Sequence, residues 1–263
     1  MILKTVFLCI VILFSGFRDC YTFGQQKIKD FNLSNFNTDG SQKWEMKGEE
    51  AVVYDNYIDV EKVRAQYYSS NDTITITSKK ARLNKDNMDI HLEGDVYIVN
   101  RDGVNLSTPS LDWKRDDNEI RTVERVVTAK DDMKIKARGM SADTEFKNVD
   151  YKSEVQAFFP GKKTEEAITI TCSGPLEIDY NQGTAVFREN VVVVNEQGKM
   201  FSDLATLYFD SEKKEIIKIV AEGNVKIVRD DNVTFSQKAI YQGKEEKIIL
   251  EGKPKLFYFP EEK

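Results

Sequence analysis

Apolar and polar residues alternate along most of this 263-residue chain, and the alternation recurs with a period of about 30 residues. Residues 74–77 and 81–83 alternate, residues 85–87 supply Asp and Asn, and residues 90–92 and 96–98 alternate again. Alternation with a period of two is typical of strands with one buried face. Asn and Asp favour turns because their side chains bond nearby backbone groups. The pattern therefore predicts a β-hairpin as the repeating unit.

Two short phrases mark the repeat. The first is Glu93-Gly94-Asp95-Val96, which returns at residues 222–225 and 251–254 and in altered form at residues 188–191. The second is a small or apolar residue, any residue and then an apolar residue, and its copies begin at Ala51, Ala81, Leu111, Met140, Leu176, Ala205 and Ala239. The steps between these copies are 30, 30, 29, 36, 29 and 34 residues. Such a repeat predicts a stack of similar supersecondary units.

Glycine and proline suggest where the strands are interrupted. We predict a bulge or bend at Gly94, because it separates two alternating runs. Pro109, Pro175 and Pro254 are expected at strand starts or edges, where a missing N–H donor is tolerated.

The fold class that follows is all-β, because the chain after residue 24 shows no convincing 3.6-residue apolar period. One hairpin cannot bury its apolar side alone, whereas two stacked layers can. We predict an elongated antiparallel structure of two stacked sheets, which leaves a sandwich, a jelly roll and a β-solenoid open. The inward residues should include Leu83, Leu92, Val96, Ile98 and Trp113. The outward residues between them should include Arg82, Glu93, Tyr97 and Asp112.

Residues 1–24 differ from the rest of the chain. Lys4 precedes an uncharged run from Thr5 to Phe17, which is the length of a signal-peptide core and short for a membrane span. Cleavage before Gln25, an uncleaved anchor and lipidation at Cys20 all remain open, and each predicts an exported body. The net charge of −6 argues against nucleic acid as a partner and against simple attraction to an anionic membrane.

Candidate catalytic residues are few. His91, the single histidine, stands between Ile90 and Leu92 on an alternating strand, so its side chain is expected to face solvent. Cys172 lies in a β run with no base at a recognisable spacing. Acidic pairs such as Asp116-Asp117 fall in predicted turns. We predict no catalytic residue, no metal site and no cofactor, which disfavours an exported hydrolase. Cleavage of residues 1–24 would leave one cysteine and no intramolecular disulfide.

Several motifs, taken in order, resemble a known family. They are Trp44-Glu-Met-Lys-Gly-Glu-Glu-Ala51, Leu92-Glu-Gly94-Asp-Val96-Tyr-Ile98, Asp102-Gly103-Val-Asn-Leu106 and Ile135-Lys-Ala-Arg-Gly139-Met-Ser-Ala-Asp143. Their order and spacing resemble LptC, the periplasmic protein of lipopolysaccharide export that is anchored in the inner membrane. Gly223-Asn-Val225-Lys-Ile227, Phe235-Ser-Gln-Lys-Ala239 and Gly252-Lys-Pro254 resemble its partner LptA, which has the same β-jellyroll fold.

The resemblance implies three segments. They are a signal peptide or membrane anchor at residues 1–24, an LptC-like β-jellyroll at 25–160 and an LptA-like β-jellyroll continuation at 161–263. An LptC body usually ends near residue 143, and here about a hundred residues follow. This leaves open whether the pathway needs a separate LptA.

The implied function is a non-enzymatic periplasmic carrier or bridge that shelters the acyl chains of lipopolysaccharide or a related glycolipid. The implied partners are that lipid, the ABC transporter complex of the inner membrane and other jellyroll proteins of the pathway. At roughly 0.8 kcal/mol per buried CH₂, a chain of about twelve carbons needs on the order of 10 kcal/mol of shelter. The lipid-groove candidates are Val53, Leu83, Ile90, Leu92, Val96, Ile98, Trp113, Ile178, Leu207, Val225 and Tyr241. The candidates for assembly through sheet edges are Phe31, Leu33, Phe36, Leu256, Phe257 and Tyr258.

The alternative is an exported structural or adhesive β-solenoid with a fully packed core and no ligand. Ala51, Ala81, Ala205 and Ala239 recur at inward positions where a tight core would favour larger residues. We interpret these alanines as room for a ligand, which favours the carrier.

Overall fold

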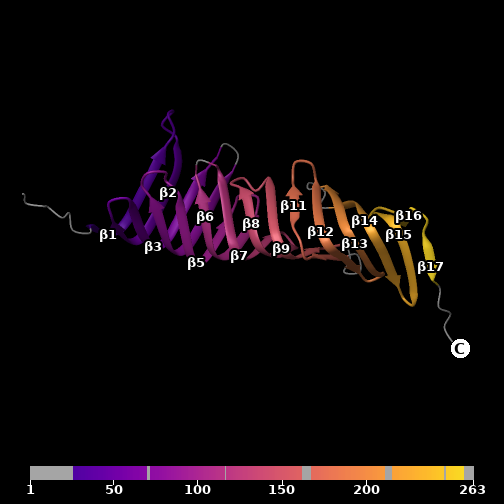
Figure 1. Ribbon diagram of the computed structural model, residues 1–263. Coiled ribbons are helices and arrows are strands. Elements are labelled where there is room, and N and C mark those ends of the chain that lie inside the picture. Colours follow the sequence, from indigo (N-terminus) through magenta and orange to yellow (C-terminus); the bar gives the residue numbers. More distant parts are fainter. Residues whose placement is uncertain are drawn as a thin grey trace, which may run out of the picture.

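The chain forms an elongated stack of β-strands in the computed structural model, which describes residues 26–69, 72–115, 117–161, 167–210, 215–245 and 247–257 (Figure 1). The described residues contain strands, turns and bends but no helix, so the all-β prediction is confirmed. Accordingly, no helix in these ranges could cross a membrane. The predicted signal or anchor segment at 1–24, Cys20 within it, and Tyr258 lie outside the described residues.

Seventeen strands account for most of the described residues. Their bounds are β1 Gln26–Phe36, β2 Gln42–Val53, β3 Tyr57–Tyr68, β4 Thr73–Asn84, β5 Ile90–Val99, β6 Asn105–Lys114, β7 Glu119–Lys130, β8 Met133–Asp143, β9 Asn148–Phe159, β10 Ile168–Cys172, β11 Leu176–Asp179, β12 Thr184–Asn195, β13 Gly198–Asp210, β14 Glu215–Arg229, β15 Asn232–Gln242, β16 Lys247–Glu251 and β17 Lys255–Phe257.

The strands form one antiparallel meander, in which neighbours along the chain are neighbours in the sheet. From β1 to β9 each strand pairs with the next. The short strands β10 and β11 then share one position between β9 and β12. The sheet continues through β13 and β14 to β15, where β16 and β17 share the last position. The 30-residue repeat is therefore a pair of strands.

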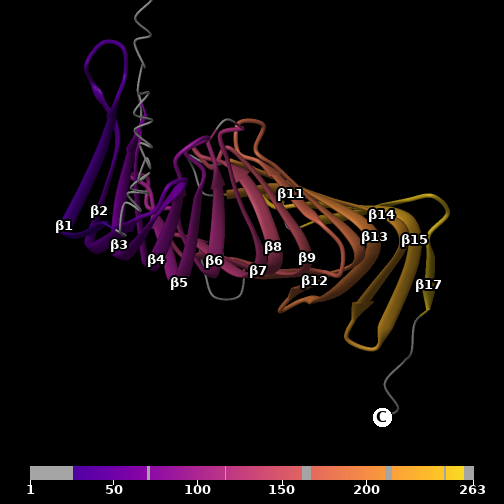
Figure 2. The same ribbon diagram turned by 60° about the vertical axis from the view of Figure 1, so that its left-hand side comes forward.

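The first repeated phrase marks the point where a strand bends. Gly94 and Asp95 have φ values of +78° and +49°, and Gly223 and Asn224 have +78° and +46°. In β5 and in β14 the pairing register shifts across these residues. Two successive left-handed residues turn the strand out of its plane. The predicted bend at Gly94 is therefore confirmed, and the bends of β12–β15 are visible in Figure 2.

A hydroxyl residue occupies the bend on four strands without the glycine phrase. The Oγ atoms of Ser78, Thr108, Ser202 and Ser236 each donate to the carbonyl two residues later, at 2.8, 3.2, 2.9 and 2.6 Å. Each hydrogen bond satisfies a carbonyl at a place where the strand ladder is interrupted. The bends line up from strand to strand and fold the sheet along its length.

The three prolines discussed above, Pro109, Pro175 and Pro254, all lie at this fold line. Pro175 separates β10 from β11, and Pro254 separates β16 from β17. Pro109 was expected at a strand start or edge, but it lies in the middle of β6, inside the register shift between Ser107 and Asp112. The expectation for Pro109 is wrong, because a residue at a bend inside a strand also does not need to donate a backbone N–H to the neighbouring strand.

The two predicted layers are the two halves of this one folded sheet. We call the half that carries Ala51, Ala81 and Ala205 wall A, and the half that carries Met46, Ile76 and Ile98 wall B. Each long strand crosses from one wall to the other at its bend. The predicted inward residues, Leu83 and Trp113 among them, are buried between the walls. The residues between them lie on the outer surface.

Candidate lipid groove

One uninterrupted row of inward residues runs along wall A from β2 to β16. Through cross-strand pairs it contains Val53, Ile58, Leu83, Ile90, Trp113, Ile120, Ala142, Val149, Ile178, Ala185, Leu207, Ile219, Tyr241 and Ile248. At about 4.8 Å between strands, this row extends on the order of 60 Å. A continuous apolar surface of this length is the property that a lipid path requires.

A second uninterrupted row faces it from wall B. It contains Leu33, Met46, Ala65, Ile76, Ile98, Leu106, Thr128, Ile135, Ala157, Ile170, Val193, Met200, Ile227, Thr234 and Leu256. Only Thr128 and Thr234 interrupt the apolar character of this row.

The structure brings most of the predicted groove residues onto these rows. Val53, Leu83, Ile90, Trp113, Ile178, Leu207 and Tyr241 lie on the row of wall A, and Ile98 lies on that of wall B. Leu92 lies on wall A one step nearer the fold line, opposite Ala81 and Leu111. Val96 and Val225 lie next to the fold line on wall B, opposite Thr108 and Ser236.

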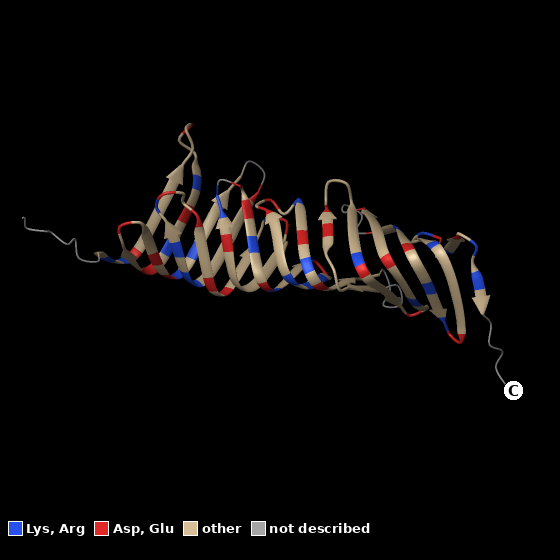
Figure 3. Ribbon diagram, in the orientation of Figure 1, with Lys and Arg blue, Asp and Glu red and all other residues tan. Residues whose placement is uncertain are grey.

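Acidic and basic residues are spread along the strands of the stack (Figure 3). The outer surface of wall A carries cross-strand ion pairs. Arg82 donates to both carboxylate oxygens of Asp59, at 2.7 and 2.9 Å, and its guanidinium lies 4.4 Å from the ring centre of Tyr57. The pKa of Arg82 is raised, chiefly by the hydrogen bond to Asp59. Lys238 pairs with Glu222 at 3.1 Å in the same way. The contrast between the two faces fixes the register, because a slip by one residue would bury these charges.

The N-terminal part of the interior is filled by aromatic side chains. Tyr67 of wall B and Trp113 of wall A meet edge to face, with ring centres 5.4 Å apart. Phe146, in the turn between β8 and β9, is buried against this pair. The cavities beside Trp113 measure about 30 and 10 Å³. This part of the interior is closed in the present conformation.

The interior opens where wall A passes into β11–β14. A cavity of about 260 Å³ lies between the walls there, at the side away from the fold line. Its apolar lining is Met133, Phe159, Ile178, Tyr180, Ala185, Phe209 and Ile216, and its rim carries Lys130, Asp131, Asp132, Asp210 and Glu215. Tyr180 and Phe209 meet edge to face at 5.8 Å, and burial raises the pKa of Tyr180 to about 12. The cavity therefore has an apolar floor and a charged mouth.

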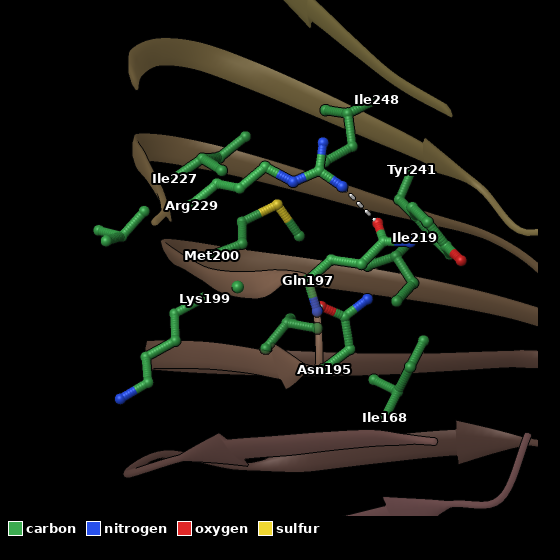
Figure 4. Close-up of a pocket in the computed structure, with 13 residues that line it drawn as sticks. Ile168, Asn195, Gln197, Lys199, Met200, Ile219, Ile227, Arg229, Tyr241 and Ile248 are labelled. Atoms are coloured by element: carbon green, nitrogen blue, oxygen red, sulfur yellow. Dashed lines mark hydrogen bonds between the residues drawn. The ribbon is translucent and has the colours of Figure 1, made fainter. Parts of the chain in front are cut away.

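A second, smaller cavity of about 60 Å³ lies further along the groove (Figure 4). Ile219, Tyr241 and Ile248 come from wall A, and Met200 and Ile227 from wall B. At its edge the side chain of Arg229 donates to Oε1 of Gln197 at 2.8 Å. Apolar side chains from both walls thus line a path that continues towards the C-terminal end of the stack.

The two ends of the stack differ in exposure. At the N-terminal end Phe31 is buried and Leu33 is half-buried, whereas Phe36 near the hairpin tip is exposed. At the C-terminal end the inward residues Ile248 and Leu256 are 40% and 66% exposed, and Phe257 is 50% exposed. Among the described strands, β1 pairs only with β2, and β17 pairs only with β15. Within the described residues, both ends therefore present a free strand edge, and the C-terminal end also leaves the interior open.

The repeated alanines are fully buried. Ala205, Ala221 and Ala239 lie opposite one another on three successive strands, and Ala51 and Ala81 hold the equivalent position near the N-terminal end. These positions lie close to the fold line, where the two walls converge and a small side chain fits. The convergence of the walls accounts for the alanines without a ligand at these positions.

The titratable groups outside the groove make local contacts. His91 is exposed, as expected, and its Nδ1 lies 2.8 Å from the carboxylate of Asp112. Cys172 is buried, and burial raises the pKa of its thiol to about 11. Among the described residues, no group of three or more His, Cys, Asp or Glu side chains could hold a metal ion.

Two family models match this chain in succession. The model described as "Lipopolysaccharide-assembly, LptC-related" matches residues 25–159, which is just over half of the chain. The chain belongs to this LptC-related family. The model described as "LptA/(LptD N-terminal domain) LPS transport protein" matches residues 172–257. The LptC-like then LptA-like arrangement is thereby confirmed. No curated protein matches the chain.

The boundary between the two matches coincides with the open part of the groove. The LptC-related match ends at Phe159 of β9, and the second match begins at Cys172 of β10. Because β9 pairs with both β10 and β11, the sheet is continuous across this boundary. The LptC-related and LptA-like parts of this chain therefore share one interior.

The cavity lining includes residues that the sequence pattern did not single out. Met133, Phe159, Tyr180, Phe209 and Ile216 each stand at the end of a strand or just beyond it. The sequence signal that could have identified them is an apolar residue at a strand end next to a charged turn. Alternation alone does not distinguish them from ordinary core positions.

Proposed function

We propose that this LptC-related protein is a periplasmic carrier and bridge that shelters the acyl chains of lipopolysaccharide between walls A and B. Its families act in lipopolysaccharide transport and are non-enzymatic. The observation that carries the proposal is the pair of apolar rows, which are continuous along the stack and open to solvent at the 260 Å³ cavity. The sugar headgroup would remain in water at the charged mouth.

The size of the cavity limits what it can hold without movement. Pockets for small-molecule ligands usually measure about 300–1,000 Å³, and this one measures about 260 Å³. It accepts part of one acyl chain as it stands. A complete multi-chain lipid requires the walls to separate at their open side, for which the fold line acts as a hinge. The filled N-terminal interior opens only if the Tyr67–Trp113 contact breaks.

The continuous sheet supports a bridge within one chain. We propose an LptC-like module at residues 25–160 and an LptA-like module at 161–263, joined through β9, β10 and β11. We also propose that residues 1–24 direct export and, if retained, anchor the protein at the inner membrane near its ABC transporter. One chain would then form the section of the lipid path that otherwise requires an LptC protein and an LptA protein to pair.

The free strand edges at the two ends support docking of like-folded partners. We propose that β1 and β17 extend the sheet by pairing with other jellyroll proteins of the pathway. Leu256→Asp places a charge on the open interior at the C-terminal end, and Lys255→Asp is its outward control on the same strand. Leu256→Asp should reduce co-purification of a jellyroll partner, and Lys255→Asp should not. Equal binding by both variants would contradict this mode of docking.

Lipids that co-purify with the protein test the carrier proposal. The chain should be expressed in its own host and its bound lipids identified by mass spectrometry. Ala185→Phe adds a ring to the lining of the 260 Å³ cavity, and Val186→Phe adds the same ring on the outer surface beside it. We expect a glycolipid with the wild type and with Val186→Phe, and several-fold less with Ala185→Phe. Circular dichroism checks that both variants fold.

The filled N-terminal interior favours a second candidate, a structural β-solenoid that carries nothing. Trp113, Leu83 and Leu92 are all buried in contact with protein. This candidate predicts that no lipid co-purifies with the wild type and that Ala185→Phe changes only stability. The lipid content of the wild-type protein distinguishes the two functions.

A further inference from the structure

Two buried hydroxyls from opposite walls lie close together, and neither makes a hydrogen bond of regular geometry. Tyr151 on wall A is completely buried, and Thr128 on wall B is 3% exposed. Neither the phenol oxygen of Tyr151 nor Oγ1 of Thr128 makes a hydrogen bond of regular geometry within the described structure, although the two hydroxyls lie close enough to act on each other as a weak hydrogen-bonded pair. Buried hydroxyls are nearly always hydrogen-bonded, because an unpartnered one loses its bonds to water without replacement. Even when they pair with each other, the two hydroxyls keep one O–H donor and free lone pairs that a further oxygen could satisfy.

The two hydroxyls are neighbours. Tyr151 lies between Met140 and Leu176 on wall A, close to the fold line. Thr128 lies between Leu106 and Ile135 on wall B. Burial is the main cause of the raised pKa of Tyr151, the phenol of Tyr180 raises it further, and hydrogen bonding with the Thr128 hydroxyl lowers it. The side chain of Tyr151 thus reaches across the interior to the opposite wall.

The pair lies inward of the 260 Å³ cavity. Lys130 and Tyr180 line that cavity. Thr128 lies two residues before Lys130 on β7, nearer to the fold line. Two residues of strand span about 7 Å. Tyr180 is the cavity residue that acts on Tyr151. An acyl chain that entered through the cavity would meet the two hydroxyls a short distance below the mouth.

We propose that Thr128 and Tyr151 recognise an oxygen-bearing acyl chain, by hydrogen bonding to a hydroxyl or carbonyl oxygen within its first few carbons. This inference rests on the proposed lipid groove and adds a specificity to it. A plain hydrocarbon chain leaves the two hydroxyls with no partner except each other. A chain that carries an oxygen at this depth satisfies them while its remaining carbons contact the apolar rows.

The test compares two fatty acids that differ by one hydroxyl. The full-length chain, purified without added lipid, is titrated with 3-hydroxytetradecanoate and with tetradecanoate below their critical micelle concentrations. The wild type should bind the hydroxylated acid roughly tenfold more tightly. Tyr151→Phe and Thr128→Val should each reduce this ratio towards one while they keep affinity for tetradecanoate. Tyr97→Phe removes an outward phenol and should leave the ratio unchanged.

The outcomes separate this inference from the groove itself. Equal affinity of the wild type for both acids, or an unchanged ratio in Tyr151→Phe, would overturn the role of the hydroxyls while leaving a lipid groove. Failure of the wild type to bind either acid would overturn the groove and the inference together. Each variant removes at most a weak contact between the two hydroxyls, so the melting temperatures should stay close to that of the wild type. A clear fall would show that the hydroxyls have protein partners and would also overturn the inference.

Discussion

Replacing Gly94 by alanine tests whether the repeated phrase is the fold line of the sheet. Gly94 has a φ of +78°, and a Cβ atom there would lie 2.9 Å from Cβ of Lys79 on β4. That atom is fixed to the neighbouring backbone and cannot rotate away. Gly103 is a matched control, because its φ is +81° and an added Cβ would have no atom within 4 Å.

The expected costs differ because only one of the two sites is crowded. An L-residue in the left-handed region costs roughly 1–2 kcal/mol, and overpacking adds roughly 1–3 kcal/mol. Gly94→Ala should therefore destabilise by about 2–5 kcal/mol and Gly103→Ala by about 1–2 kcal/mol. For a chain of this length each kcal/mol lowers the melting temperature by roughly 2–4 °C. Thermal unfolding followed by circular dichroism should show a fall of about 4–20 °C for Gly94→Ala and about 2–8 °C for Gly103→Ala. Equal falls would refute the close approach of β4 and β5 at the bend.

Two further predictions concern titratable groups. Because Cys172 is buried and its thiol pKa is raised to about 11, iodoacetamide at pH 8 should label Cys172 far more slowly in the native chain than in the urea-unfolded chain. The chain also contains Cys9 and Cys20, so labelling is followed on the peptide that contains Cys172, and similar rates there would show that β10 is open. Although burial by itself raises the pKa of Asp89, Lys114 at 2.7 Å and the N–H of Arg115 at 3.1 Å outweigh it and lower the net value. Asp89→Asn should thus lower the free energy of unfolding by roughly 1 kcal/mol at pH 7. This difference from the wild type should shrink as the pH falls below about 3.9, the pKa of an unfolded Asp. A difference that stays constant down to pH 2 would contradict the ion pair.

The alternation was sufficient to predict the strands and the inward face. Leu83 and Arg82 fall on opposite surfaces because side chains in a strand alternate strictly, whatever the packing around them. Gly94 was predicted as a bend because glycine between two alternating runs is an unusual choice. The hydroxyl residues of the bend, such as Ser78 and Ser202, were not predicted. Serine is common on strand surfaces, and its role here depends on a carbonyl two residues away.

Properties that depend on contact between the walls could not be predicted from the sequence. Trp113 and Ile248 occupy the same row and the same alternation, yet one is buried and the other 40% exposed. The difference comes from which strands cover each residue in the stack. The neighbouring hydroxyls of Thr128 and Tyr151 belong to different walls, so no local pattern relates them. From the sequence we interpreted the buried alanines near the fold line as room for a ligand. The convergence of the two walls, which accounts for these small side chains, is a tertiary property that the sequence pattern does not show.

Site-specific photo-crosslinking tests the central claim most directly. A photoreactive amino acid is placed at Ile178, which lines the cavity, or at Glu177, which precedes it on β11 and faces outward. Cells that make the protein and lipopolysaccharide are irradiated, and adducts are detected with an antibody to the lipid. The account predicts a lipopolysaccharide adduct at Ile178 and none at Glu177. Adducts at both positions, or at neither, would contradict transport through the interior of the folded sheet.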